Sequence, residues 1–189
     1  MSNFVRTLAP AGALALAMIV VVAVRADDDD IKNSQKEVLD MVKALEGGKA
    51  PTAKQLADFR KKFDDLDAVM TIYKPSSKKG LGSGKKGPGD GIEQKINNLV
   101  KRVSSPAKMK NELLRLGYIN AVMADVAKQY APAKPKKGKG AKEWNAYCDE
   151  QKKGSMELIA AAKAADVKKI KAAAKRIADA CTDCHSDFK

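Results

Sequence analysis

The sequence predicts an all-α protein. Apolar residues recur at intervals of three and four along most of the 189 residues, which is the spacing of one face of a helix. No segment alternates apolar and polar residues with the period of two that a half-buried strand shows. Stretches rich in glycine, proline and serine separate the periodic segments, so we expect helices joined by turns and loops.

The first predicted helix begins at Ser34, which can form a capping box with Glu37. It ends at Gly47–Gly48, because glycine commonly terminates a helix. Three residues spaced by three and four give this helix one apolar face: Val38, Met41 and Leu45. This first segment is short, and it is the first of six that we expect.

The second predicted helix begins at Thr52, with Gln55 completing its capping box. Its apolar stripe runs through Leu56, Phe59, Phe63, Leu66, Met70 and Tyr73. Lys74–Pro75 ends it, since the residue before a proline is disfavoured in helical geometry. Residues 75–91, rich in Gly, Lys, Ser and Pro, are predicted to be a flexible basic loop.

Two helices are predicted in the middle of the chain. Asp90 is expected to cap the shorter one, whose apolar side is Ile92, Ile96, Leu99 and Val103. Ser105 and Pro106 fit an N-cap followed by proline at the first helical position. The helix behind them carries Met109, Leu113, Leu116, Met123 and Tyr130. Residues 131–140 are predicted to be a second flexible basic loop.

The last two of the six predicted segments reach the end of the chain. One carries Trp144, Cys148, Ser155, Ile159 and Ala162 on one face. Asp166 is expected to cap the other. The core-facing stripe of this final helix is Val167, Ile170, Ala174, Ile177, Cys181, Cys184 and Phe188. Both cysteines therefore belong to a face that we expect to be buried.

The chain closes on Cys181-Thr182-Asp183-Cys184-His185, which is the Cys-x-x-Cys-His pattern of covalent c-type haem attachment. Two thiols at this spacing reach the two vinyl groups of one macrocycle, and the adjacent imidazole turns under the iron. His185 is the only histidine in the sequence. The pattern thus predicts one haem with His185 as its proximal ligand, and no second histidine for the other side.

Other interpretations of this cysteine pair are a thiol–disulfide pair, half of a zinc site, or a chance spacing. A thioredoxin-like pair opens a helix after a strand, and no strand is expected here. A structural zinc takes about four ligands, and the chain holds only three thiols and one imidazole in all. The third thiol, Cys148, is expected to be a buried small apolar residue, with an intermolecular disulfide as the alternative.

The N-terminus has the layout of a secretory signal peptide. Arg6 gives a basic start, residues 8–24 are almost wholly apolar, and four aspartates follow Ala26. We expect cleavage after Ala26, which leaves residues 27–189 as one helical domain with no stable membrane span. An uncleaved anchor is the alternative, although the apolar run is short for a span of about 20 residues.

From Trp144 to Lys189 the chain resembles the class II c-type cytochromes, cytochrome c-prime and its methionine-ligated relatives. The resemblance rests on a helix, the Ala164-Ala165-Asp166 turn, and the haem motif followed by an aromatic and a basic residue. It implies an antiparallel four-helix bundle of the cytochrome c-prime type, with extra helical segments in the N-terminal half, in a periplasmic protein. It also implies one covalent haem c held by Cys181, Cys184 and His185.

The sixth iron ligand decides what such a haem does. A methionine raises the reduction potential and suits electron transfer, whereas an open position admits small gases. Methionine-ligated members of the family take this ligand from the first helix, which implies Met41. Met70 is the rival, since it lies on an apolar stripe one turn before Tyr73. Ordinary core filling is the alternative for both methionines.

The sequence therefore predicts an exported mono-haem cytochrome that carries single electrons and is not an enzyme. The alternatives are a five-coordinate haem protein that binds NO or CO, and a haem-free thiol redox or metal-binding protein. The formal net charge of +13, with lysines clustered in residues 75–91 and 131–140, suits an acidic redox partner or an anionic membrane surface. Nucleic acid is not expected, because the basic runs lack aromatic residues for base stacking. The resemblance also implies a homodimer.

Overall fold

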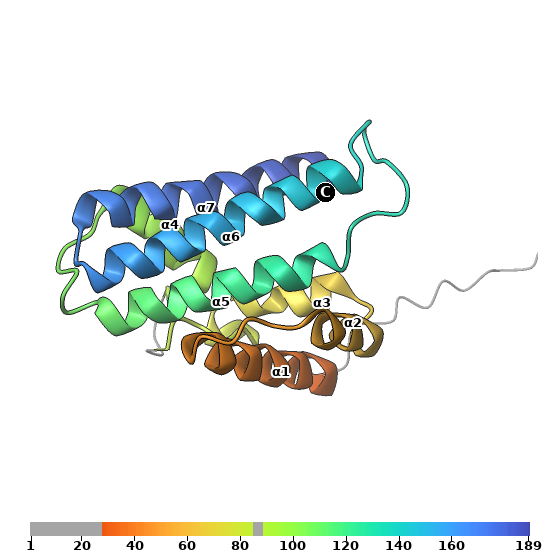
Figure 1. The fold of residues 1–189 in the computed structure, drawn as a ribbon, viewed down its shortest axis with the longest axis horizontal. Helices are drawn as coiled ribbons and strands as arrows, with labels where there is room; N and C mark the ends of the chain where they lie inside the picture. Colours follow the sequence, from red (N-terminus) through yellow and green to blue (C-terminus); the bar gives the residue numbers. More distant parts are fainter. Residues whose placement is uncertain (1–27, 85–88) are drawn as a thin grey trace, which may run out of the picture.

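The computed structural model describes residues 28–84 and 89–189, which form helices joined by loops and turns (Figure 1). They form α1 (Asp28–Glu46), α2 (Ala53–Lys62), α3 (Leu66–Met70), α4 (Ile92–Lys101), α5 (Lys110–Lys128), α6 (Ala141–Lys163) and α7 (Val167–Phe188). Two short 3-10 helices, η1 (Thr71–Tyr73) and η2 (Ser76–Lys78), lie between α3 and α4. The all-α prediction is confirmed, and the predicted signal peptide lies outside the described residues.

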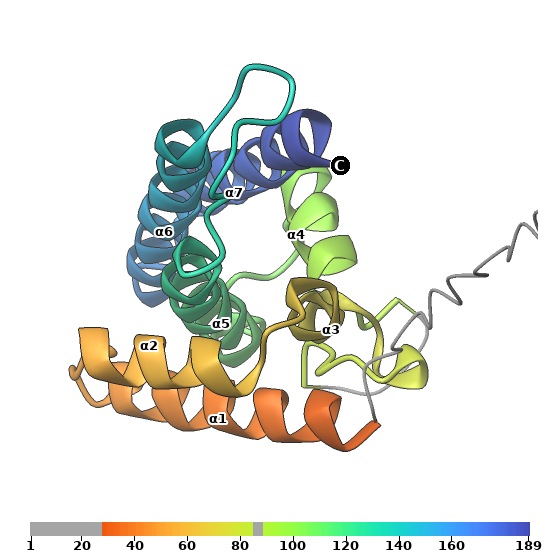
Figure 2. The same cartoon turned by 90° about the vertical axis from the view of Figure 1, so that its right-hand side faces the viewer.

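The central helix of the fold is α5. It packs against α6 on one side and against α1 and α2 on the other (Figures 1 and 2). α6 and α7 run antiparallel beside each other, and α4 packs on α7. Eleven residues of α5 are buried, because neighbouring helices cover it on several faces.

Two glycines let the central helices approach closely. A Cβ atom on Gly117 of α5 would lie 2.6 Å from Cγ1 of Ile159 and 3.2 Å from the carbonyl oxygen of Ser155 on α6. A Cβ atom on Gly154 of α6 would lie 3.2 Å from the carbonyl oxygen of Ala173 on α7. Glycine inside a helix costs about 1 kcal/mol relative to alanine. At both positions this lower helix propensity accompanies a close approach of two helix backbones.

The first helix begins earlier than predicted. α1 starts at Asp28, and Ser34 is buried within it, where its hydroxyl donates to the carbonyl oxygen of Ile31 at 2.9 Å. The predicted capping box of Ser34 with Glu37 is therefore wrong. Three aspartates in the first turn favour the earlier start, since carboxylates stabilise the positive end of a helix. The helix ends before Gly47–Gly48, as predicted.

The second predicted helix is broken in the middle. Its capping box is confirmed, since the Gln55 N–H donates to Thr52 Oγ1 at 3.2 Å and Gln55 Oε1 accepts from the Thr52 N–H at 2.9 Å. α2 ends at Lys62, and Asp65 starts α3 by accepting a hydrogen bond from the Asp67 N–H at 2.8 Å. Aspartate side chains compete for nearby backbone N–H groups and can interrupt a helix. Apolar periodicity alone does not reveal such a break.

Asp90 does not cap α4, contrary to prediction. Its buried carboxylate instead accepts hydrogen bonds from Ser76, from the N–H at 3.1 Å and from the hydroxyl at 2.5 Å. The carbonyl oxygen of Asp90 also accepts from the Ser83 N–H at 2.7 Å. Because these bonds satisfy Asp90 within the loop of residues 75–91, its side chain fastens that loop rather than the helix.

The predicted N-cap at Ser105 is also wrong. One turn forms after Pro106, where the Met109 N–H donates to the carbonyl oxygen of Ser105 at 3.0 Å. The next amide, that of Lys110, makes only a long hydrogen bond of 3.5 Å to the carbonyl oxygen of Ala107, three residues earlier. Continuous α-helical bonding therefore begins only at Lys110.

We expect Gly117→Ala to lower the free energy of unfolding although it gains about 1 kcal/mol of helix propensity. Overpacking against α6 costs about 1–3 kcal/mol, so urea denaturation should show a net loss of about 1 kcal/mol. Gly47→Ala is the control, since a Cβ atom there meets ordinary contacts from 3.4 Å outward. A Gly117→Ala variant as stable as its parent would contradict the close contact of α5 with α6.

Candidate functional site

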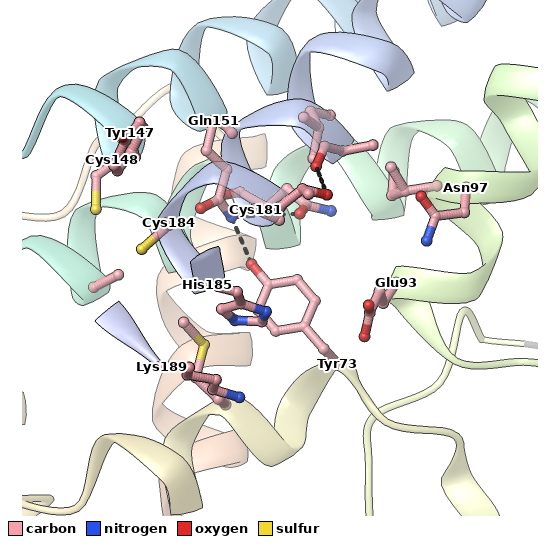
Figure 3. A pocket seen from close by; sticks show the side chains of 18 of the residues that line it. Tyr73, Glu93, Asn97, Tyr147, Cys148, Gln151, Cys181, Cys184, His185 and Lys189 are labelled. Atoms are coloured by element: carbon pink, nitrogen blue, oxygen red, sulfur yellow. Dashed lines mark hydrogen bonds between the residues drawn. The ribbon is translucent and has the colours of Figure 1, made fainter. Parts of the chain in front are cut away.

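A cavity of about 410 Å³ lies on the inner side of α7, and we call it the α7 pocket (Figure 3). Its other walls come from α3 and η1, α4, α5 and α6. The volume lies within the range of about 300–1,000 Å³ that is usual for small-molecule and cofactor sites. Segments far apart in the sequence therefore meet around one space that can hold a ligand.

α7 contributes the three residues of the sequence motif to one wall of this pocket: Cys181, Cys184 and His185. Residues three and four apart lie on the same face of a helix, which explains why the thiols and the imidazole share one cavity. The start of α7 is fixed as predicted, because the carboxylate of Asp166 accepts from the Lys169 N–H at 3.0 Å. The motif thus occupies the last turns of a well-defined helix.

Burial keeps both thiols of the motif neutral. It raises the pKa of Cys181 to about 12 and that of Cys184 to about 11. Thiols that work in disulfide exchange have lowered pKa values and often lie at helix N-termini, whereas these two lie near the C-terminal end of α7. The pocket therefore disfavours the haem-free redox interpretation of the pair.

The imidazole of His185 lines the pocket from an exposed position, and its surroundings favour the neutral form. Partial burial, and then the nearby ammonium group of Lys189, lower the pKa of His185 below its usual value. Glu93 and Asp67 act in the opposite direction but more weakly. A neutral ring nitrogen is the form that binds metal ions, and the lowered pKa of His185 favours that form.

The structure separates the two methionines that the sequence offers as sixth ligands. Met70, at the end of α3, lines the α7 pocket together with His185. Met41 is buried in the main core on α1, and it is not one of the described residues that line the pocket. Only Met70 therefore shares a cavity with the motif.

A polar pair that the sequence analysis missed lies inside the pocket. The side-chain amide of Gln151 on α6 donates to the hydroxyl of Tyr73 at 2.6 Å and approaches the carbonyl oxygen of Asn120 at 3.4 Å (Figure 3). Burial raises the pKa of Tyr73 well above its usual value, so the hydroxyl keeps its proton. Because its oxygen accepts from Gln151, that proton remains available for another acceptor.

The sequence does carry a signal for Gln151. It follows Cys148 by three residues and precedes Ser155 by four, so it lies on the apolar face of α6. A glutamine on a core-facing stripe needs a buried hydrogen-bonding partner. The pattern therefore indicates a buried polar contact at Gln151. Nothing in the sequence names Tyr73 as that partner, since the two are far apart along the chain.

A small apolar cluster holds the end of α7. The ring centroids of Trp144 and Phe188 lie 5.1 Å apart in an edge-to-face arrangement, and the indole N–H donates to the carbonyl oxygen of Ala127 at 2.8 Å. Cys148 is 3% exposed within this cluster, and Cys184 packs against it. This burial agrees with the expected role of Cys148 as a small core residue and leaves its thiol inaccessible to a second chain.

The lysines of the two basic loops are only partly available to a partner. Three lysines of residues 131–140 contact the C-terminal end of α7: Lys136, Lys137 and Lys139. In the other loop Lys79 pairs with Asp28. Lys85 and Lys86 lie outside the described residues. Part of the positive charge therefore serves contacts within the chain.

Comparisons with protein families, with curated proteins and with solved structures yield no match to this chain. Across residues 28–84 and 89–189, no three or more His, Cys, Asp or Glu side chains are grouped so that they hold a metal ion. None of the described helices is both long and apolar enough to cross a bilayer. The resemblance to class II cytochromes stays a prediction that rests on the motif.

We expect the hydrogen bond between Tyr73 and Gln151 to appear as a coupling energy in the free energy of unfolding. Tyr73→Phe should cost about 1 kcal/mol, because it leaves the Gln151 amide without its main partner. In a Gln151→Met background the same substitution should cost about 1 kcal/mol less, as urea denaturation of the double-mutant cycle would measure. Strictly additive effects would mean that the two side chains do not interact.

Proposed function

We propose that this chain is an exported, mono-haem c-type cytochrome that carries single electrons and is not an enzyme. The observation that supports it most is that Cys181, Cys184 and His185 line one wall of a single pocket. The two thiols would hold the haem through thioether bonds, and the neutral imidazole would bind its iron. Once bound, haem supplies a reversible one-electron change at the iron.

The chain's own residues would fix the cofactor and shield it. Trp144 and Phe188 anchor the end of α7, which carries the attachment residues. Ile96 of α4 and Ile177 of α7 line the pocket with apolar surface and limit the entry of water. Burial of this kind, together with the axial ligands, is what sets a haem potential.

The arrangement of the helices supports a bundle related to that of cytochrome c-prime. α5, α6 and α7 are antiparallel neighbours, α4 packs on α7, and the motif ends the last helix. In this proposal α1, α2 and α3 are the extra segments of the N-terminal half. The predicted signal peptide at residues 1–26 would direct the protein to the periplasm. Its cleavage would remove Arg6 and Arg25, and the remaining formal net charge of +11 suits an acidic redox partner.

Met70 is the sixth ligand that this structure favours. It lines the same pocket as His185 and comes from α3, whereas Met41 belongs to the main core. The family pattern places the ligand on the first helix, so the choice of Met70 is a departure from that pattern. Methionine ligation opposite histidine raises the reduction potential, which suits a carrier of electrons.

A gas-binding protein is the second candidate, and the Tyr73 hydroxyl favours it. This hydroxyl faces the α7 pocket, is protonated, and has its oxygen already engaged by Gln151. A donor in such a place can stabilise a small polar ligand bound at an open iron position, since distal hydrogen bonds govern such binding. The two candidates therefore differ in whether Met70 or a gas occupies the sixth position.

Attachment of the haem can be tested with alanine substitutions in a host that matures c-type cytochromes. In the parent and in Cys148→Ala, haem absorbance should stay with the polypeptide after acid extraction. In the double variant Cys181→Ala with Cys184→Ala it should be lost completely, because no thioether can form. Cys148 is a matched control, since it is a third thiol that lines the same pocket. Extractable haem in the parent would overturn the proposal.

The sixth ligand can be tested with Met70→Leu, and with Met41→Leu as a matched control of similar volume change. Met70→Leu should lower the midpoint potential and make the reduced protein bind carbon monoxide at neutral pH. Met41→Leu and the parent should do neither. Ready carbon monoxide binding by the parent, weakened at least threefold by Tyr73→Phe, would instead favour the gas-binding candidate.

A further inference from the structure

The C-terminal end of α7 is capped by lysine side chains from a distant loop. The last four carbonyl groups of a helix have no amide partner within it, and α7 ends at Phe188. Lys137 Nζ donates to the carbonyl oxygen of Ser186 at 3.0 Å. Lys136 Nζ donates to that of Phe188 at 2.7 Å, and it lies 3.4 Å from that of Lys189. Ammonium groups suit this negative end of the helix dipole.

The loop is shaped to present these lysines. Lys136 and Lys139 exchange two backbone hydrogen bonds of 2.8 Å, and the residues between them, Lys137 and Gly138, have φ values of 49° and 75°. Two successive positive φ values make the tight reversal seen in hairpin turns. Lys139 Nζ also lies 3.8 Å from the carboxylate of Asp187. We call Lys136, Lys137 and Lys139 the lysine clamp.

The clamp acts on the turn that carries the imidazole. The carbonyl oxygen of His185 accepts from the Lys189 N–H at 3.0 Å, so the last turn must stay helical for His185 to keep its direction. Tyr147 adds a second hold from α6, where its hydroxyl donates to the Asp187 carboxylate at 2.5 Å. The last turn of a helix opens with almost no free-energy cost unless other contacts hold its backbone and side chains. The hydrogen bonds from Lys136, Lys137 and Tyr147 should therefore limit fraying of this turn.

We propose that Lys136 and Lys137 are positioning residues that keep His185 on the wall of the α7 pocket. This inference rests on the proposed function only where it concerns iron. The effect on the last turn of α7 belongs to the polypeptide itself, with or without haem. In this proposal residues 131–140 stabilise the end of α7, whereas their composition indicates only a flexible linker.

The test compares three pairs of substitutions in the mature chain. Lys136→Met with Lys137→Met removes both donors. Lys134→Met with Lys142→Met removes two charges from exposed positions nearby and is the matched control. Lys136→Arg with Lys137→Arg keeps donors that can reach the same carbonyl groups.

Amide hydrogen exchange of the C-terminal peptide, residues 177–189, is measured first in chains produced without haem attachment. Exchange in the last turn should be about three- to tenfold faster in the Lys136/Lys137 methionine pair. The control pair and the arginine pair should exchange as the parent does. Equal rates in the methionine pair and the control pair would overturn the clamp.

The second measurement uses haem-loaded chains. The methionine pair should shift the midpoint potential and broaden the visible spectrum, as expected when the proximal imidazole is less firmly held, while the control and arginine pairs should not. A spectrum and potential identical to the control's would overturn the positioning role. If no chain carries haem, the proposed function fails. The hydrogen-exchange measurement on haem-free chains then still tests whether the lysine clamp stabilises the last turn of α7.

Discussion

The inner face of α7 can approach α6 closely because Gly154 leaves room for the backbone of Ala173. That approach lets Trp144 of α6 meet Phe188 edge to face and brings Cys184 against the same apolar cluster. On the other side α4 packs on α7, and residues of α3, η1, α4, α5 and α6 surround the α7 pocket with α7. The motif therefore lies where the packed contact of α7 with α6 meets the cavity.

The pocket is chemically neutral inside and charged at its edge. Burial keeps the thiols of Cys181 and Cys184 and the hydroxyl of Tyr73 protonated, and the lowered pKa of His185 favours its uncharged form. Carboxylates and ammonium groups line the outer part of the cavity: Asp67, Glu93, Lys74 and Lys189. Such a lining keeps unpaired charges out of the inner part of the cavity, where burying one would cost several kcal/mol.

Local patterns predicted the parts of the fold that depend on local physics. The helical periodicity, the Thr52 capping box and the Asp166 cap all rest on neighbours within four residues, and the structure confirms them. The sequence does not predict the break before Asp65 or the bonds of Asp90 to Ser76, because a carboxylate chooses among partners that only the folded chain brings near. The motif identified three lining residues of the pocket, but the contributions of Met70 and Tyr73 required the fold.

The intact mass of the secreted protein tests the central claim most directly. We would express the full gene in a bacterium that matures c-type cytochromes, recover the protein from the periplasm and weigh it under denaturing conditions. The account predicts the mass of residues 27–189 plus that of one haem, covalently retained. A secreted chain that weighs only as much as its amino acids would contradict it.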